Sequence, residues 1–241
     1  MKKVGITGAA GNIGSTLRQG LGSLYELTLY DIKEISNQPA RFVKVDFADA
    51  HALAGIFDGL DCLIHLAGNP NPGAPAQSTM RNNFQATSLV FQAAREAGVA
   101  KIVFASSNFY HEGSIRDFLQ GQSKELITLD TPPTPISLYG QSKVYGENIG
   151  RHLSYLGTRF VALRIGWTVP EDNPAAYGGA YMRAVFCSKR DLTEAFRCAV
   201  ETDADFLTAF AVSDNGRPVF DLAQTRQRLG FKPRDNAEDY V

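Results

Sequence analysis

Three glycines lie three residues apart directly after the first apolar run of the chain, in the stretch VGITGAAGNIGSTL. They are Gly8, Gly11 and Gly14. Glycine in a turn between a strand and a helix reaches backbone conformations that other residues avoid. It also lets a pyrophosphate approach the backbone, and the N–H groups at the start of the helix attract such an anion. The stretch therefore predicts a strand, a dinucleotide-binding turn, and a helix that begins near Asn12.

Two carboxylates follow at the places where a bound dinucleotide would need them. Asp31 ends the second apolar run, ELTLYD, roughly twenty residues beyond the glycine turn, where a carboxylate can accept hydrogen bonds from both hydroxyls of an adenosine ribose. Asp46 ends the third run, FVKVDF, at a position suited to the adenine. A glycine-rich stretch alone can be a simple tight turn, but this context favours dinucleotide binding.

Short apolar runs alternate with helical patterns along the chain. Several of the runs are apolar at nearly every position, which indicates strands buried on both faces, as in a parallel sheet between helix layers. Repeated strand, helix, strand units of this kind predict an α/β chain with a Rossmann-type doubly wound parallel sheet. The expected strands are 3–7, 26–31, 42–47, 61–68, 101–107, 159–166 and 206–213, and the expected helices are 12–22, 49–57, 79–98, one from near Leu138, 189–201 and 221–230.

The alternation weakens in the second half of the chain. Residues 109–137 lose the pattern, and three prolines close together in DTPPTPISLYG indicate an ordered surface loop. A length of 241 residues suits one α/β domain with a modest appendage. We therefore expect a dinucleotide-binding domain over residues 1–166 and a small C-terminal substrate lobe over residues 167–241, formed by returning segments.

The overall charge and the cysteines narrow the class of function. A net charge of −1 offers no footprint for nucleic acid or for an anionic membrane, and the longest apolar runs have only the length of strands. The first residues lack the apolar stretch of a signal peptide. Cys62, Cys187 and Cys198 are odd in number and widely spaced, which favours buried thiols over disulfides or metal ligands. We expect a cytoplasmic protein with no metal and no membrane or nucleic-acid partner.

A second motif that carries chemistry is SLYGQSKVYGE. Tyr139 and Lys143 are four residues apart and share one face of a helix. A nearby ammonium favours the phenolate of a tyrosine, so the pair can act as a general base. Ser106 and Ser107 end a predicted strand, at the edge of the sheet where ligands bind. A hydroxyl there can hold a substrate oxygen, although an incidental Tyr–Lys pair and simple turn serines would give the same letters.

The stretches TGAAGNIG, HLAG, FASSN and YGQSK occur in the order and approximate spacing of the extended short-chain dehydrogenases/reductases, which the chain resembles over nearly its whole length. These enzymes belong to the NAD-dependent epimerase/dehydratase superfamily. The resemblance implies NAD as cofactor and Ser107, Tyr139 and Lys143 as the catalytic group. It further implies the following cofactor contacts: Gly8, Gly11, Asn12, Ile13 and Gly14 at the pyrophosphate, Asp31 at the ribose, Asp46 and Phe47 at the adenine, Leu66, Ala67, Gly68 and Ile165 along the cofactor, and Asn83 in a proton relay.

Within this superfamily the chain is similar to the uronate dehydrogenases and the NAD-dependent glucose-6-phosphate dehydrogenases. The stretches that carry this likeness are HLAGNPNPGAP, RNNFQAT, LYGQSKVYGEN, LRIGWTVPE, SKRDLTEAF and GFKPRDNAE. The likeness implies NAD-dependent oxidation of an aldose, a uronate or a hexose phosphate, at C1 to a lactone. It also implies a homodimer or a higher homo-oligomer, paired through the helix that carries Tyr139 and its neighbour.

The substrate residues depart from that subgroup at three positions. Phe109 stands where the subgroup has a histidine, and Trp167 stands where it has a small polar residue. The subgroup also has an arginine that can bind the anionic group of the sugar, and Arg183 lies a couple of positions away from that place. The expected substrate contacts are thus Ser107, Asn108, Phe109, Trp167 and Arg183. Two alternatives stay open: another reaction of the extended family, such as a sugar epimerase, dehydratase or carbonyl reductase, and a regulator that binds NAD without catalysis.

Overall fold

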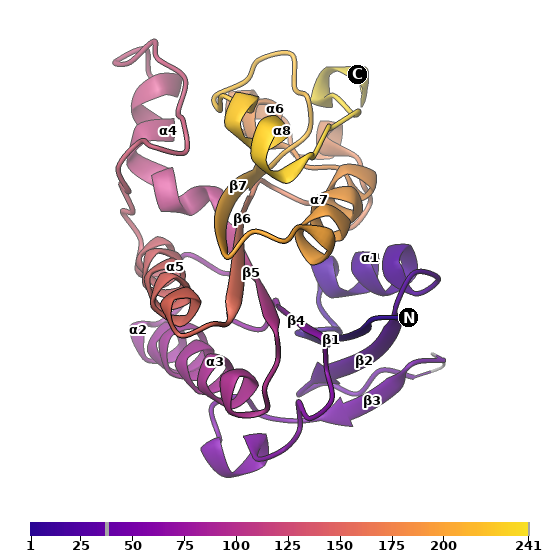
Figure 1. Ribbon diagram of the computed structural model, residues 1–241. Coiled ribbons are helices and arrows are strands. Elements are labelled where there is room, and N and C mark those ends of the chain that lie inside the picture. Colours follow the sequence, from indigo (N-terminus) through magenta and orange to yellow (C-terminus); the bar gives the residue numbers. More distant parts are fainter. Residues whose placement is uncertain (37–38, 241) are drawn as a thin grey trace.

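The computed structural model describes residues 1–36 and 39–240, and within them seven parallel strands form one sheet (Figure 1). The strand order is β3-β2-β1-β4-β5-β6-β7, which contains the Rossmann order 3-2-1-4-5-6. The predicted doubly wound parallel sheet is confirmed. The strands are β1 (Lys3–Thr7), β2 (Glu26–Asp31), β3 (Arg41–Lys44), β4 (Cys62–His65), β5 (Lys101–Ser107), β6 (Arg159–Ile165) and β7 (Phe206–Ala211).

Helices lie on both faces of this sheet. The α-helices are α1 (Asn12–Leu21), α2 (Ala76–Thr79), α3 (Ala86–Glu96), α4 (Glu112–Leu119), α5 (Leu138–Tyr155), α6 (Gly179–Val185), α7 (Lys189–Glu201) and α8 (Ala223–Leu229). The shorter turns are η1 (Ala50–Leu53), η2 (Met80–Gln85, a π-helical segment), η3 (Asn108–His111), η4 (Pro174–Ala176) and η5 (Ala237–Tyr240).

Each face of the sheet has its own apolar core. On one face α1 and α7 pack against the strands, and Leu17, Leu21 and Phe196 are fully buried there. On the other face α3 and α5 pack against the strands around Phe91 and Phe160. Because both faces are covered, the strands are apolar at nearly every position, as the sequence indicated.

The structure corrects several of the expected elements. The strands expected over 42–47 and 61–68 end earlier, at Lys44 and His65, and the helix expected over 79–98 is divided into η2 and α3. Residues 109–137 are not one continuous loop, because η3 and α4 lie within them. Ile115 of α4 is buried with Phe210 and Phe220, which lie about a hundred residues downstream and give no local signal. The helix expected over 49–57 is only the turn η1, and α6 begins inside a segment read as a loop. Gly55 has φ +69°, which ends any regular helix after η1.

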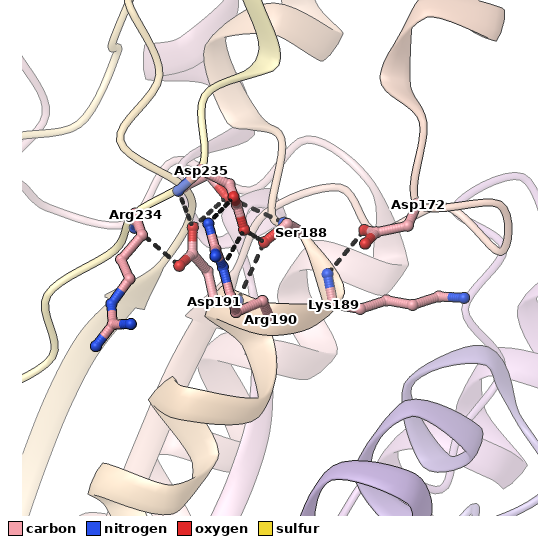
Figure 2. A network of polar contacts seen from close by, with 8 residues as sticks. Asp172, Ser188, Lys189, Arg190, Asp191, Arg234 and Asp235 are labelled. Carbon is pink, nitrogen blue, oxygen red and sulfur yellow. Dashed lines mark hydrogen bonds and ion pairs between the residues drawn. The ribbon is translucent and has the colours of Figure 1, made fainter. Parts of the chain in front are cut away.

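Residues 167–241 contribute to the same sheet as the rest of the chain. β7 pairs with β6 in parallel, and α7 covers the face that α1 also covers. Figure 2 shows how the start of α7 binds the C-terminal segment: the buried Asp191 carboxylate accepts hydrogen bonds from the Arg234 and Asp235 backbone N–H groups at 2.9 and 3.0 Å. Ser188 caps α7 and also donates to Asp235 at 2.6 Å. A domain boundary at residue 166 stays a prediction.

The three cysteines and the hydropathy of the helices can be compared with the expectation of buried thiols and no membrane-spanning segment. Cys62, Cys187 and Cys198 are all buried free thiols. Burial raises the pKa of the Cys62 thiol to about 12 and that of Cys198 to about 11, so neither is a reactive thiolate at neutral pH. Within residues 1–36 and 39–240, no helix combines the length and the apolar character that crossing a membrane requires.

Candidate active site

The glycine turn joins β1 to α1 and leaves room beside its backbone. Gly8 has φ +69°, and a side-chain carbon at this position would lie 2.8 Å from the Ala67 nitrogen. A side-chain carbon at Gly14 would overlap the Gly8 carbonyl oxygen. At Gly11 such a carbon meets only that carbonyl, at 3.3 Å, so the outer side of the turn is open. Gly8 and Gly14 therefore allow close packing, and Gly11 allows a ligand to approach.

The N-terminus of α1 fits a pyrophosphate. The first N–H groups of an α-helix have no partner within the helix, and no side chain caps α1. An uncapped helix start at the carboxyl edge of a parallel sheet attracts a phosphate group. Asn12 begins this helix, and its side-chain amide donates to Thr168, at 3.1 Å to the hydroxyl and 3.3 Å to the carbonyl. This contact joins the turn to the segment that follows Ile165 at the end of β6, a link the sequence did not reveal.

Asp31 is buried at the end of β2, next to the glycine turn. Its carboxylate accepts hydrogen bonds from the backbone N–H groups of Ala10 at 2.9 Å and of Lys33 at 2.8 Å. These bonds fix the carboxylate at the position expected for the ribose. Carboxylate oxygens have several lone pairs, so Asp31 can accept from a ribose as well.

Asp46 and Phe47 follow β3 rather than ending it. The Asp46 carboxylate pairs with Arg81 at 2.6 Å and accepts from the Ala48 N–H at 3.0 Å, and the hydrogen bond from Arg81 lowers the pKa of this carboxyl. Phe47 is buried, with its ring edge-on to His65 at 6.5 Å between centroids. The sequence did not indicate that Arg81 pairs with Asp46 at the expected adenine position.

The end of β4 is joined to its neighbours by short hydrogen bonds. The Thr7 hydroxyl accepts from the N–H groups of Leu66 and Ala67, both at 3.2 Å. Gly68 follows with φ +159°. These bonds place residues 66–68 beside the glycine turn, where the cofactor contacts were expected.

Asn83 is buried in the π-helical segment η2 and binds two elements at once. Its side chain accepts from the Asn69 N–H at 2.8 Å, donates to the Asn69 carbonyl at 3.0 Å, and donates to the Ser142 hydroxyl of α5 at 3.4 Å. π-helical segments are frequent at functional sites. Asn83 thus fixes the loop after β4 against α5, and the sequence did not single out Ser142.

Tyr139 and Lys143 lie one turn apart on α5, close to the end of β5. Ser137 caps the helix, since its hydroxyl accepts from the Gly140 N–H at 3.1 Å. The Lys143 ammonium donates to the Ala105 carbonyl at 2.8 Å and lies 5.2 Å from the centre of the Tyr139 ring. Side-chain carbons at Gly146 and Gly150 would meet the rings of Phe104 and Phe160, so these glycines allow α5 to approach the sheet.

Burial shifts the pKa of both members of this pair. Burial raises the pKa of Tyr139, and a hydrogen bond with the Ser107 hydroxyl opposes that rise. Burial lowers the pKa of Lys143 to about 8, so at neutral pH most of the side chain is still an ammonium ion. The structure therefore brings the three expected catalytic residues together: Ser107, Tyr139 and Lys143.

Ser107 is also bonded to the next residues of the chain. Its hydroxyl donates to the Asn108 side-chain oxygen at 3.1 Å and accepts from the Phe109 N–H at 3.2 Å. The Asn108 amide donates to the hydroxyl of Tyr181. The Phe109 ring stands edge-on to Tyr139 at 5.5 Å between centroids. Asn108 and Phe109 thus lie beside the catalytic group, together with a tyrosine that the sequence analysis missed.

Trp167 lies next to two tyrosines. Its ring centroid is 5.8 Å from that of Tyr177 and 5.8 Å from that of Tyr181, and the residue is 41% exposed. The stretch WTVPEDNPAAYGGAY is rich in aromatic residues, and this was the sequence signal that could have pointed to Tyr181. Trp167 thus packs beside Tyr181, the partner of Asn108, whereas Phe109 packs against Tyr139.

The structure does not bring Arg183 to this group. Its guanidinium pairs with the Glu238 carboxylate at 3.1 Å. Arg183 follows Tyr181 by two positions in α6, and residues two apart on a helix do not share a face. With Tyr181 directed at Asn108, Arg183 is directed toward the C-terminal segment.

A buried ion pair supports the site from behind. Arg164 of β6 and Glu147 of α5 make two hydrogen bonds, at 2.8 and 3.0 Å, and both side chains are about 5% exposed or less. The Ser106 hydroxyl donates to the same carboxylate at 2.6 Å. This network joins α5 to the ends of β5 and β6, which carry Ser107 and Ile165, and sequence reasoning had not found it.

The sequence comparisons agree with this geometry. The profile described as "NAD dependent epimerase/dehydratase family" matches residues 4–174, and the chain belongs to this family, whose cofactor is NAD. It is 32% identical to the NAD-dependent glucose-6-phosphate dehydrogenase of Haloferax volcanii, over 98% of this chain and 94% of that protein. It is also 32% identical to the L-arabinose 1-dehydrogenase (NAD(P)(+)) of the same organism, over the full length of both.

Solved structures of sugar dehydrogenases are also similar to this chain. The crystal structure of uronate dehydrogenase from Agrobacterium tumefaciens superimposes with a TM-score of 0.84 at 28% identity, over 100% of this chain and 87% of that one. That of a glucuronic acid dehydrogenase from Chromohalobacter salexigens superimposes with a TM-score of 0.86 at 28% identity, over 99% and 86%. The predicted likeness to this subgroup is confirmed.

Proposed function

We propose that this protein is an NAD-dependent dehydrogenase that oxidises an aldose at C1 to the lactone. One observation carries the proposal: Tyr139, Ser107 and the Lys143 ammonium meet at the carboxyl edge of the sheet, where the uncapped start of α1 also lies. The named relatives are NAD-dependent sugar dehydrogenases, which supports the same reaction class.

Ser107 and Tyr139 would act on the C1 hydroxyl of the sugar. The Ser107 hydroxyl, held by Asn108 and the Phe109 N–H, orients the substrate oxygen toward Tyr139. Tyr139, as phenolate, takes the hydroxyl proton while the carbon becomes a carbonyl carbon. NAD⁺, when bound, would supply the acceptor for the hydride that leaves C1.

Lys143 would keep Tyr139 in its reactive form. Its ammonium lies 5.2 Å from the Tyr139 ring and is held by the Ala105 carbonyl. A positive charge at this distance favours the phenolate over the phenol. From the same position Lys143 would hold a hydroxyl of the nicotinamide ribose, while Asp31 would hold the adenosine ribose and the start of α1 would hold the pyrophosphate.

The proposal also covers the kind of sugar, the oligomeric state and the cellular compartment. The names of the relatives cover a uronate, a sugar phosphate and a pentose, so they support an aldose without choosing among these. We infer a homodimer or higher homo-oligomer paired through α5 and α3, which light scattering can test. Three buried free thiols support a reducing compartment such as the cytoplasm.

Formation of NADH across a panel of aldoses, uronates and hexose phosphates tests the reaction. An epimerase returns its cofactor to the starting form and accumulates no NADH, so stoichiometric NADH separates a dehydrogenase from that alternative. The Tyr139→Phe variant keeps the ring and removes the proton acceptor, so turnover falls about 10²–10⁴-fold while NAD binding persists. Retention of more than roughly a tenth of the activity in this variant would mean that another group acts as the base.

A further inference from the structure

Building on the proposed function, we propose that the sugar is a neutral aldose, without carboxylate or phosphate, and that the Tyr181 hydroxyl binds it where a cation would bind an anionic sugar. The inference rests on three features of the site: a polar chain that ends at Tyr181, an aromatic surface beside it, and the position of the charged groups.

The polar chain runs from the catalytic tyrosine to Tyr181 through two buried residues. The Ser107 hydroxyl opposes the rise in the pKa of Tyr139 and donates to the Asn108 side-chain oxygen at 3.1 Å. The Asn108 amide donates in turn to the oxygen of Tyr181, so the hydroxyl hydrogen of Tyr181 points elsewhere. Asn108 is 3% exposed and fixes Tyr181 relative to Tyr139. A neutral hydrogen-bond donor is thereby held at a set place beside the reacting group.

Aromatic rings form the surface next to this donor. The Trp167 ring lies 5.8 Å from both Tyr177 and Tyr181, measured between centroids. Aromatic faces carry partial negative charge, which suits the C–H face of a sugar ring and disfavours a carboxylate or phosphate. Asp172 holds the loop between Trp167 and Tyr177 to the start of α7, accepting from the Lys189 N–H at 2.8 Å (Figure 2). The surface is therefore built into the fold.

The charged groups around this surface leave an anion without a partner. Arg183 and Arg217 both pair with the Glu238 carboxylate, and among the described residues Asn108 bonds to neutral groups. Burial raises the pKa of Tyr181 to about 12, and the Glu112 carboxylate adds to that rise. The Lys143 ammonium is already bonded to the Ala105 carbonyl beneath Tyr139. An anion that loses water contacts against these rings without gaining a partner pays a free-energy cost, so the site favours a neutral sugar.

Binding of matched sugars tests the inference apart from turnover. The Tyr139→Phe variant saturated with NAD⁺ is titrated in a calorimeter with D-galactose against D-galacturonate, and with D-glucose against D-glucuronate and glucose 6-phosphate. We expect the neutral member of each set to bind at least about tenfold more tightly. Equal or tighter binding of the charged members, or no binding of any sugar, overturns the inference. A neutral sugar that binds this complex but gives no NADH with the unaltered enzyme refutes the proposed dehydrogenase and leaves the inference standing.

Substitutions at Tyr181 test the residue itself. Tyr181→Phe removes the hydroxyl, and we expect KM for the preferred neutral aldose to rise about tenfold with a smaller change in kcat. Tyr181→Arg supplies a cation, and we expect the ratio of galacturonate to galactose binding to rise at least about tenfold. Tyr155→Phe, at an 80% exposed position, is the matched control and leaves both quantities unchanged. NAD affinity and the melting temperature of each variant show whether it is folded.

KM values of an Arg183 variant decide whether Tyr181 or Arg183 binds the sugar. In Arg183→Ala we expect KM to stay the same for every sugar. An increase of tenfold or more for a charged sugar alone would make Arg183 the group that binds the anion, and the neutral-aldose inference would be wrong.

Discussion

Asp31 illustrates how one carboxylate can serve both the fold and the expected ligand. It accepts two backbone hydrogen bonds, from Ala10 in the glycine turn and from Lys33 beyond β2. The same contacts hold its negative charge at the end of β2, where we expect the ribose of the cofactor and, in NADP, its 2′-phosphate. The residue therefore shapes the turn and is placed to select the cofactor.

From Asp31 we predict a preference for NAD over NADP of at least about tenfold in affinity. Like charges brought together in an interface cost several kcal/mol, and each ~1.4 kcal/mol is a factor of ten. Arg18 and Lys33 are near in sequence and offset part of this cost. Calorimetric titration with both cofactors measures the ratio, and Asp31→Asn should reduce it. Equal affinities in the unaltered protein would remove Asp31 from the ribose.

Tyr139 also sets an expectation for pH dependence. Burial raises its pKa above the usual value near 10, so at neutral pH only a small fraction is phenolate in the free protein. Because the phenolate is the base and the Lys143 ammonium that favours it has a pKa of about 8, kcat/KM for oxidation rises from about pH 6 to pH 8 and levels off or falls toward pH 9. Initial rates across that range, with cofactor affinity measured at each pH, check the trend. A profile that is flat, or that falls, between pH 6 and 8 would contradict a tyrosine base.

At the scale of elements, α5 decides the geometry of the site. Gly146 and Gly150 allow α5 to lie against β5 and β6. The Glu147–Arg164 pair fixes the position of α5 along the direction of these strands. Tyr139 and Lys143 then project at the ends of these strands. A buried charge pair of this kind is costly to break, since the remaining charge has no partner.

We therefore predict that Glu147→Gln lowers the free energy of unfolding by about 3–5 kcal/mol. The amide keeps the size of the side chain and removes the charge that Arg164 requires. Urea denaturation followed by circular dichroism measures the change. Glu194→Gln in α7 breaks an ion pair with Arg197 that is 36–40% exposed, and it should cost less than about 1 kcal/mol. Similar losses in both variants would argue against a stabilising role specific to the buried pair.

At the scale of the whole molecule, two buried histidines couple the fold to pH. His65 and His111 are fully buried, and burial lowers the pKa of each to about 3, with Arg164 adding to the effect at His111. The unfolded chain binds protons at these side chains below about pH 6.5, whereas the folded chain does so only near pH 3. Stability contributed by the neutral histidines is present above pH 6.5 and is lost as pH falls toward 3.

The predicted result is a steep loss of stability in acid, of up to about 1.4 kcal/mol per pH unit for each histidine between pH 6 and 4. Unfolding free energies from urea titrations at several pH values give the slope. His65→Gln lowers stability overall, since it disturbs hydrogen bonds with Thr7 and Thr87, but it reduces the slope. His152→Gln, at an exposed position, is the control and keeps it. An unchanged slope in His65→Gln would exclude this residue as a source of acid sensitivity.

The sequence by itself determined the sheet, the glycine turn, and the presence of Tyr139 and Lys143 on one helix face. These features are local: apolar runs fix burial on both faces of a strand, the glycines repeat within one turn, and a spacing of four residues fixes a shared face on a helix. Helix α7 is the element that the sequence predicted most accurately, since its expected range 189–201 is also the observed one.

Only the tertiary structure decided what surrounds those residues. Arg183 pairs with Glu238, Asn108 with Tyr181, and Arg164 with Glu147, over separations of 55, 73 and 17 residues. Such pairs depend on how distant segments pack, and a single sequence carries no spacing rule for them. The turn-and-helix segment around α4 was missed for the same reason, because Ile115 finds its apolar partners in β7 and beyond. The glycine turn and its neighbours, where we expect the cofactor, were therefore predictable from the sequence, whereas contacts across the fold formed the aromatic surface where we propose that the sugar binds.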